Sequence, residues 1–407
     1  MCQNKTYFFA YNLLITFVYN SELYKLIIAN HFCISSVLKV FVLYVQLPIQ
    51  WLYIYYASIY LTHFFLFLAF SVLISSSQNL NLSSNTMAAL GNRGTVTEAS
   101  GFKPEEDAQK LHNAMKGAGT NEATIIEILA HRTIAQRQKI KEAFKQSVGK
   151  DLLDCLKSEL TGNFEKVVVG LMMSAPVYDA YELRNAIKGA GTEEACLIDI
   201  LASRSNAEKK EIIATYKKEH GKSLEDDVCG DTSGMFQRVL VSLLAAGRDE
   251  STKVDEAQAV QDAKDIYEAG EARWGTDEVK FLTVLSVRNR NHLLRVFQEY
   301  QKISGRDIED SIKREMSGCL EDVFLAIVKC MKNKPAFFAE RLYKSMKGLG
   351  TTDSVLIRIM VARAEIDMLD IKAEFLKMYG KTLHSFIKGD TSGDYRKILL
   401  ELCGGEK

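Results

Sequence analysis

The amino-acid sequence predicts an all-α protein made of four similar units, each with room for about five short helices. The strings MKGAGT, IKGAGT, EARWGT and MKGLGT recur at nearly even intervals, beginning at Met115, Ile187, Glu271 and Met346. Each string is followed by apolar residues at helical spacing, as in Ile125, Ile126, Ile128 and Leu129. No segment shows the sustained alternation of a half-buried strand. Because a helical unit of about 70 residues has little core of its own, we expect the four units to stack.

Proline, glycine and capping residues indicate where the helices of each unit begin and end. Proline stands near the start of three units, where the first helical turn tolerates a missing N–H, at Pro104, Pro176 and Pro335. In the first unit, Gly119 suits a left-handed helix end and Thr120 is the expected N-cap of the next helix. An arginine recurs at one point of every unit and is expected to tie helices to inward-facing acids: Arg132, Arg204, Arg288 and Arg363. The predicted units are residues 102–173, 174–246, 257–330 and 333–405, with a charged linker from Gly247 to Gln258.

The N-terminal part, residues 1–86, is strongly apolar and holds few charged side chains: Lys5, Glu22, Lys25 and Lys39. Residues 51–74 carry no charge and are long enough to cross a bilayer as one helix. An ordinary initiator context follows at Met87, so the favoured interpretation is a gene-model artefact with Met87 as the true start. A membrane anchor and an uncleaved signal-like segment are the alternatives. Residues 87–101 form a short tail in which Thr95 and Thr97 are candidate phosphorylation sites.

Charge balance and the absence of catalytic motifs exclude several classes of protein. With 51 basic and 51 acidic residues, the chain has no global field that would hold a nucleic acid. It contains no nucleophile–base pair, phosphate loop or zinc spacing, so we expect no enzyme. The six cysteines after Met87 form no Cys-x-x-Cys pair and are expected to be small buried side chains.

A second regularity links each glycine string to a distant acid. One constant separation in sequence leads from the third residue of each string to an acid, and the acids reached are Glu159, Asp231, Glu315 and Asp390. With roughly one acid per eight residues, four such matches would arise by chance on the order of once in several thousand trials. The spacing therefore reflects a functional constraint or a fixed salt bridge.

Binding of a hard divalent cation is the chemistry that needs such a pairing. Calcium takes oxygen ligands from backbone carbonyls, carboxylates and water. A glycine loop can turn carbonyls toward one point, and an acid brought back by the fold supplies negative charge. One carboxylate leaves open positions that phosphate oxygens of lipid head groups can fill. The sequence therefore predicts sites that are weak alone and strong as a set of four on one membrane.

These loops, the acid at a constant separation from each, and the strings SELTGNFE, CGDTSGMF and KGDTSGDY resemble the annexin family from Ser100 to Gly405. The resemblance implies a slightly curved disc of four five-helix repeats with calcium loops on the convex face. The family also implies secondary calcium positions, which use Thr120 with Glu122 and Thr351 with Asp353. An acid in the first turn of a helix also interacts favourably with the helix dipole, so a structural role is the alternative. The implied main ligands are the carbonyls of Met115, Gly117 and Gly119 with Glu159, of Ile187, Gly189 and Gly191 with Asp231, and of Met346, Gly348 and Gly350 with Asp390.

The third repeat departs from the pattern because its loop is one residue longer and Arg273 replaces a glycine. By position, the ligands are Gly270, Arg273 and Gly275 with Glu315, and only the carbonyl of Arg273 is needed. Trp274 stands at the loop tip. It is similar to a tryptophan that enters the head-group layer in this family, which suits its amphipathic ring; partly buried packing is the alternative.

The resemblance implies a cytoplasmic protein with Ca²⁺ as cofactor that binds anionic membranes, phosphatidylserine among them, as a peripheral adaptor in exocytosis, vesicle aggregation or membrane repair. Lateral self-association on the bilayer is a further expectation. One alternative is a protein anchored through residues 51–74. Another is calcium-regulated ion conduction through a polar centre, although charged residues between domains more often form structural ion pairs; the positions concerned are Asp179, Glu182, Asp199, Arg204 and Arg358.

Overall fold

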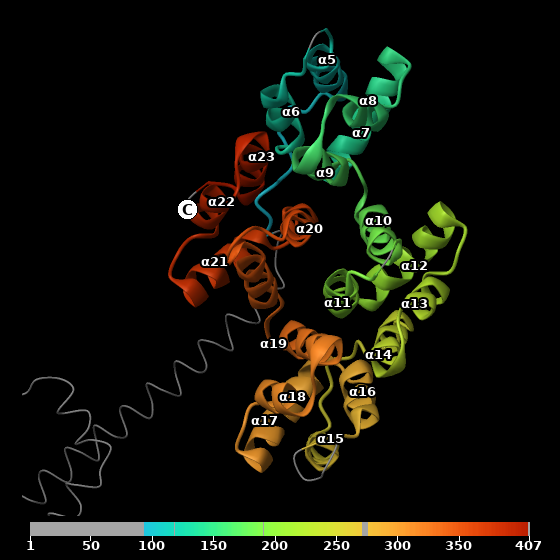
Figure 1. Cartoon of the computed structure of the whole chain (residues 1–407), viewed down its shortest axis with the longest axis vertical. Coiled ribbons are helices and arrows are strands. Elements are labelled where there is room, and N and C mark those ends of the chain that lie inside the picture. The colour runs from blue at the N-terminus through green and yellow to red at the C-terminus, as the bar shows by residue number, and fades with distance from the viewer. Residues whose placement is uncertain (1–92, 118, 190, 271–275, 406–407) are drawn as a thin grey trace, which may run out of the picture. The chain divides into compact units, whose positions relative to one another are not determined.

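The computed structural model describes residues 93–117, 119–189, 191–270 and 276–405. The chain divides into Met1–Gly91 and Asn92–Lys407, and every described residue belongs to the second part. Within these ranges the regular elements are α-helices, and no strand occurs (Figure 1). The predicted all-α class with four five-helix repeats is confirmed.

The first two repeats each contain five separate helices. In both, the first helix packs against the third, α5 against α7 and α10 against α12. The helices of the first repeat are α5 (Pro104–Ala114), α6 (Glu122–Leu129), α7 (Ile134–Val148), α8 (Leu152–Glu159) and α9 (Gly162–Leu171). Those of the second are α10 (Ala175–Ile187), α11 (Glu194–Ser203), α12 (Asn206–His220), α13 (Leu224–Asp231) and α14 (Gly234–Leu244).

The last two repeats share one kinked helix, α19 (Gly318–Met346). Asn333 has a non-helical backbone inside it, with φ −156° and ψ 96°. Its side chain accepts a hydrogen bond from the N–H of Ala336 (3.1 Å), so Asn333 caps the second half and Pro335 falls in a first turn as predicted. The other helices are α15 (Glu256–Ala269), α16 (Glu278–Val287), α17 (Arg290–Ser304), α18 (Ile308–Glu315), α20 (Asp353–Arg363), α21 (Met368–Tyr379), α22 (Leu383–Asp390) and α23 (Gly393–Cys403).

The predicted cap of α6 is wrong by one residue. Asn121 is the N-cap, and its side chain accepts a hydrogen bond from the N–H of Thr124 (3.1 Å). The hydroxyl of Thr120 donates instead to Glu159 (3.0 Å). Gly119 does adopt a positive φ of 93°, but it lies inside a loop, because α5 already ends at Ala114.

The recurring arginine ties helices together in three repeats as predicted. Its guanidinium pairs through two nitrogens with an aspartate of the first helix, Arg132 with Asp107, Arg204 with Asp179 and Arg288 with Asp262, at 2.7–3.1 Å. The fourth repeat differs because Phe338 stands three residues after Pro335, where the first two repeats have aspartate three residues after their proline. Arg363 therefore lies over the Phe338 ring, 4.8 Å from its centroid, and pairs with Asp367 in its own connection.

One cluster of buried apolar side chains runs through all four repeats. The first and fourth repeats meet directly, because α9 contacts α20 and α23 while α6 contacts α23 (Figure 1). An ion pair reinforces this junction: the buried Arg137 donates to Glu365 (2.5 Å), which also accepts from the N–H of Ile134 (2.8 Å). The second and third repeats meet where α14 packs against α16 and α19.

Within the described part of the chain, no helix combines the length and apolar character needed to span a bilayer. The alternative of a membrane anchor at residues 51–74 and the favoured start at Met87 both concern residues outside the described part of the chain. The expectation that the cysteines after Met87 are buried is wrong for Cys229, which is exposed on α13.

Candidate calcium-binding and membrane-docking loops

A loop joins the first and second helices of every repeat, and one backbone hydrogen bond closes it at the same place. The N–H of the residue after the loop threonine donates to a carbonyl at the end of the first helix: Asn121 to Ala114 (2.8 Å), Glu193 to Ala186 (2.9 Å), Asp277 to Ala269 (2.7 Å) and Thr352 to Ser345 (2.8 Å). The closed segment is one residue longer in the third repeat. The longer third loop read from the sequence is therefore confirmed.

The loop glycines hold backbone conformations that other residues rarely adopt. In the first, second and fourth loops φ lies between 88° and 137° at Gly117, Gly119, Gly189, Gly191, Gly348 and Gly350. A side chain at such φ values would be strained, so the loop path depends on glycine. All six are exposed, whereas the residues that open the loops are half-buried or buried and anchor them: Met115, Ile187 and Met346.

The fold returns each distant acid to its loop. Each acid is the last residue of the short fourth helix of its repeat, α8, α13, α18 or α22. The loop threonine donates its hydroxyl to that carboxylate in all four repeats: Thr120 to Glu159 (3.0 Å), Thr192 to Asp231 (2.5 Å), Thr276 to Glu315 (3.3 Å) and Thr351 to Asp390. The constant spacing in sequence is thus a contact in space.

Helix stability does not explain these acids. A carboxylate at the C-terminal end of a helix faces the negative end of the dipole, which costs about 0.3–1 kcal/mol. Among the described residues, no lysine or arginine forms an ion pair with any of the four, so a fixed salt bridge is not the reason for the spacing. Three of these carboxylates lie beside loops with exposed glycines, and the fourth, Glu315, lies beside the buried Gly270. A carboxylate in an unfavourable position beside such a loop suits a cation site.

The third loop is described only at its ends. Gly270 lies beside the acid, because a Cβ built on it would be 3.6 Å from Cγ of Glu315. Its φ of −118° differs from that of the other loop glycines. Arg273, Trp274 and Gly275 lie outside the described residues.

Leu349, at the tip of the fourth loop, is the most exposed large apolar side chain of the described residues, at 108% relative exposure. It occupies the fourth position of MKGLGT, the place that Trp274 holds in EARWGT. An apolar side chain this exposed at the tip of a polar loop suits insertion into a lipid layer.

The two acids expected at secondary calcium positions have structural roles in the fold. Glu122 and Asp353 are the first residues of α6 and α20, where a carboxylate favours the positive end of the helix dipole. Asp353 also accepts a hydrogen bond from the hydroxyl of Tyr395 (2.8 Å). The helix-start role read from the sequence therefore accounts for both acids.

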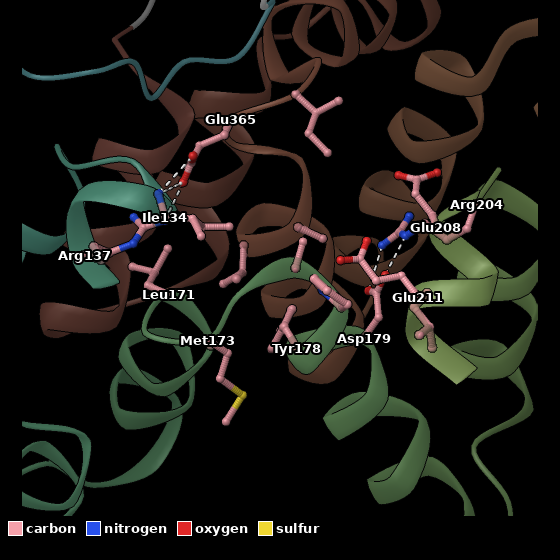
Figure 2. Close-up of a pocket in the computed structure, with 17 residues that line it drawn as sticks. Ile134, Arg137, Leu171, Met173, Tyr178, Asp179, Arg204, Glu208, Glu211 and Glu365 are labelled. Carbon is pink, nitrogen blue, oxygen red and sulfur yellow. Dashed lines mark hydrogen bonds and ion pairs between the residues drawn. The ribbon is translucent and has the colours of Figure 1, made fainter. Parts of the chain in front are cut away.

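The residues considered for ion conduction form ion pairs. Arg204 pairs with Asp179 at one side of a cavity of about 200 Å³, and Arg137 pairs with Glu365 at another (Figure 2). Arg358 pairs with Asp199 (2.8 Å), both nearly inaccessible to solvent. Burial raises the pKa of Glu182 to about 7, an effect that Arg358 opposes. The ion pairs account for four of the five residues, and conduction gains no support.

A sequence profile of the annexin family matches residues 106–171, 178–243, 261–327 and 337–402. The chain belongs to the annexin family. These matched ranges each contain one loop threonine and its paired acid, so the fourfold geometry described above is a property of the annexin repeat in this chain.

Curated relatives and solved structures agree with this assignment. The chain is 65% identical to annexin A4 of Sus scrofa over 320 residues, 79% of this chain and 100% of that protein. It is 66% identical to annexin A4 of Homo sapiens over 313 residues, 77% of this chain and 98% of that protein. The structure of chicken annexin V is 55% identical, with a TM-score of 0.74 over 77% of this chain and 99% of that chain. Calcium-bound annexin (Sm)1 is 34% identical, with a TM-score of 0.69 over 78% and 94%.

Homology to annexin A4 implies calcium-dependent phospholipid binding by a non-enzymatic membrane-binding protein. Sequence reasoning about this annexin missed two features of its loops. The hydroxyl of the loop threonine was overlooked, although threonine follows the second glycine or its equivalent in all four strings. Leu349 was missed because only the backbone carbonyls of its loop were considered as ligands; its alignment with Trp274 was the available signal.

Proposed function

We propose that this annexin docks onto phosphatidylserine-rich membranes through Ca²⁺ held at its four loops. In this role it is a cytoplasmic, peripheral adaptor in exocytosis, vesicle aggregation or membrane repair, and docked copies associate laterally. The observation that carries the proposal is a carboxylate at a helix C-terminus in all four repeats, which accepts from the hydroxyl of the loop threonine and has no basic partner among the described residues.

The residues present fit a hard divalent cation. Each site offers one carboxylate and several backbone carbonyls, all of them oxygen donors. The described residues hold no cluster of three or more His, Cys, Asp and Glu side chains, so a carboxylate-rich cage of high affinity is not the arrangement used. The ion would be held by the loop carbonyls together with Glu159, Asp231, Glu315 and Asp390, and it would supply positive charge for lipid phosphate.

Sedimentation with vesicles tests the proposal. The full chain is mixed with phosphatidylserine vesicles across a calcium titration, and chelator is then added. We expect pelleting that rises with calcium and reverses with chelator, and none with phosphatidylcholine vesicles. The double variant Glu159→Gln with Asp390→Asn keeps hydrogen-bond acceptors for the threonines but loses charge, so its midpoint should move to higher calcium.

A matched control separates the sites from general charge. Glu142→Gln with Asp226→Asn removes the same charge from exposed positions on α7 and α13 and should leave the midpoint unchanged. Equal shifts in both double variants, or pelleting that chelator does not reverse, would contradict docking through the loops.

A further inference from the structure

A second polar cavity, of about 460 Å³, lies where the second and third repeats meet the segment that joins them. It is lined by the last residues of α11, the first residues of α12 and α17, and residues 248–252. The docking loops precede α11 and α16, and the cavity lies at the opposite ends of these two ten-residue helices. At 1.5 Å per residue, roughly 15 Å of helix separates it from the loops.

Two lysines in this cavity have no anionic partner. Lys209 on α12 is 4% exposed, and Lys334 in α19 is half-buried. Within the described residues, neither ammonium forms an ion pair or a hydrogen bond. A lysine whose stem is largely buried and whose ammonium has no partner in the chain favours an anion from outside it, and both lysines line this cavity.

Two arginines add charge that no carboxylate neutralises. Arg248 donates to the carbonyls of Leu285 (2.7 Å) and Arg288 (2.8 Å) at the end of α16. Arg290 donates to the carbonyl of Lys332 (3.2 Å). These bonds fix where the guanidinium groups stand but leave their positive charge in place. Arg204 also lines the cavity, but its charge is balanced by Asp179.

Three carboxylates lie near these cations and keep their negative charge, because their hydrogen bonds come from neutral donors. Asp249 accepts hydrogen bonds from Asn289 (2.8 Å) and Ser251 (2.8 Å), and Glu208 accepts from the N-cap of α12. Glu250 is exposed and acts on Lys209 only at longer range. Burial, with Arg248 and Lys334 adding to it, lowers the pKa of Lys209 to about 8. At Lys209, repulsion by Arg248 and Lys334 therefore outweighs attraction by Glu208 and Glu250.

Two helix N-termini contribute to the same cavity. α12 begins at Asn206 and α17 at Arg290, and both residues line it. The N-terminal end of a helix carries partial positive charge, which favours an anion.

We propose that this cavity binds a compact, phosphate-dense anion, either a free polyphosphate compound or the polyphosphorylated headgroup of a lipid. The four cations outnumber the two carboxylates that line the cavity, so the net positive charge and the two helix N-termini favour an anion with more than one negative charge. The volume of about 460 Å³ suits a small ligand, and the zero net charge of the chain disfavours an extended polyanion such as nucleic acid. Calcium is not required, because the cavity lies at the far ends of the helices that follow the docking loops.

Calorimetric titration of the full chain with inositol trisphosphate tests the cavity. Excess chelator removes calcium, so the docking loops do not contribute to binding. We expect saturable binding of one equivalent. The variant Lys209→Gln with Lys334→Gln should bind at least about tenfold more weakly, because two charge-assisted contacts are lost. Glu250→Gln should bind a few-fold more tightly, because it removes a competing negative charge from the cavity lining.

The control variant Lys110→Gln with Lys264→Gln removes the same charge from exposed positions on α5 and α15 and should bind as the wild type does. Thermal midpoints establish that all variants are folded, and protection of Lys209 from an amine-reactive reagent by the probe gives a second readout. Absence of saturable binding, or equal affinity of the two double variants, would overturn the proposal.

Vesicles containing phosphatidylinositol bisphosphate, also in chelator, distinguish the sources of phosphate. Sedimentation that the Lys209→Gln, Lys334→Gln variant loses identifies a lipid headgroup. Binding of inositol trisphosphate without sedimentation identifies a free compound. Both results uphold the cavity as an anion site, and neither depends on the calcium-dependent function proposed above.

Discussion

At the scale of single residues, the four loop acids combine an unfavourable place in a helix with a favourable place for a cation. Asp231 ends α13, and its carboxylate accepts from Thr192 (2.5 Å). In chelator, Asp231→Asn should be as stable as the wild type or more stable by about 0.3–1 kcal/mol, because the repulsion with the helix dipole is lost. In millimolar calcium the order should reverse, because the variant loses one site's binding energy. Thermal unfolding in both buffers measures this; a variant that is less stable in both would show that the acid serves the fold.

Leu349 offers a second test at this scale. Leu349→Ser should leave the thermal midpoint unchanged because the side chain is fully exposed. It should raise the calcium needed for half-maximal pelleting, since burial of a leucine in lipid contributes about 1.5–3 kcal/mol. Leu376→Ser, at an exposed position on α21 outside the loops, is the control. Identical pelleting of both variants would exclude insertion of this loop.

Glu182 makes stability depend on pH. Burial raises the pKa of its carboxyl to about 7 in the folded chain, with Glu193 adding to the effect and Arg358 opposing it. An unfolded glutamate titrates near 4.3. The folded state therefore holds the proton more tightly, and Glu182 destabilises the fold progressively as pH rises from about 4.3 to 7. Relative to the wild type, Glu182→Gln should gain about 3 kcal/mol over this window and then level off. Urea unfolding of both proteins at pH 5 and pH 8 measures this difference in stability. A stabilisation by Glu182→Gln that decreases as pH rises would contradict a raised pKa of Glu182.

The sequence predicted the acids but not their surroundings. A fixed spacing repeated four times marks two positions that meet, and the structure brings them together through the loop threonine. A hydroxyl that donates to a carboxylate and one that caps a helix look the same in sequence, so Thr120 was assigned to the wrong partner. The distinction depends on the path of the loop backbone, which three-dimensional closure decides.

At the scale of elements, the N-terminal tail holds the last repeat against the first. The N–H of Thr95 donates to the carbonyl of Ala364 (2.8 Å), and its hydroxyl donates to the carbonyl of Leu402 (2.5 Å). Thr95→Glu replaces this donor with an anion, so it should lower the free energy of unfolding by about 1–3 kcal/mol. The same change at the exposed Thr97 should have little effect. Urea unfolding compares them; equal losses would mean that negative charge in the tail, not the Thr95 contact, matters.

Helices were predictable where the pattern repeats and less so where it breaks. The apolar spacing and the prolines gave the five-helix unit, including the start of the second half of α19 at Asn333. The partner of Arg363 could not be read from the other repeats, because Phe338 stands where two of them carry aspartate three residues after a proline. A repeat pattern predicts shared structure, and a substitution at one repeat creates a contact that only the fold reveals.

At the scale of the whole molecule, the sequence repeats predict the four units but not which units contact one another. Nothing in the sequence pairs α9 with α20, or Arg137 with Glu365, although these contacts join the first repeat to the fourth. The closure matters for the proposed function because it joins the four candidate sites in one body. Sites on one body bind a membrane as a multivalent array, with overall attachment about 10²–10⁴ times stronger than a single site.

A cumulative series of variants tests this multivalency. Asp390→Asn is combined in turn with Glu159→Gln, Asp231→Asn and Glu315→Gln, and pelleting on phosphatidylserine vesicles is followed against calcium. Each added substitution should raise the midpoint and reduce the steepness of the curve, because fewer ions contribute to one attachment. With one site left, binding should need calcium near a single weak site's affinity, on the order of 10⁻⁴ to 10⁻³ M. If Asp390→Asn alone abolished pelleting, or if three substitutions left the curve unmoved, the four loops would not act as one array, since an array loses its members gradually.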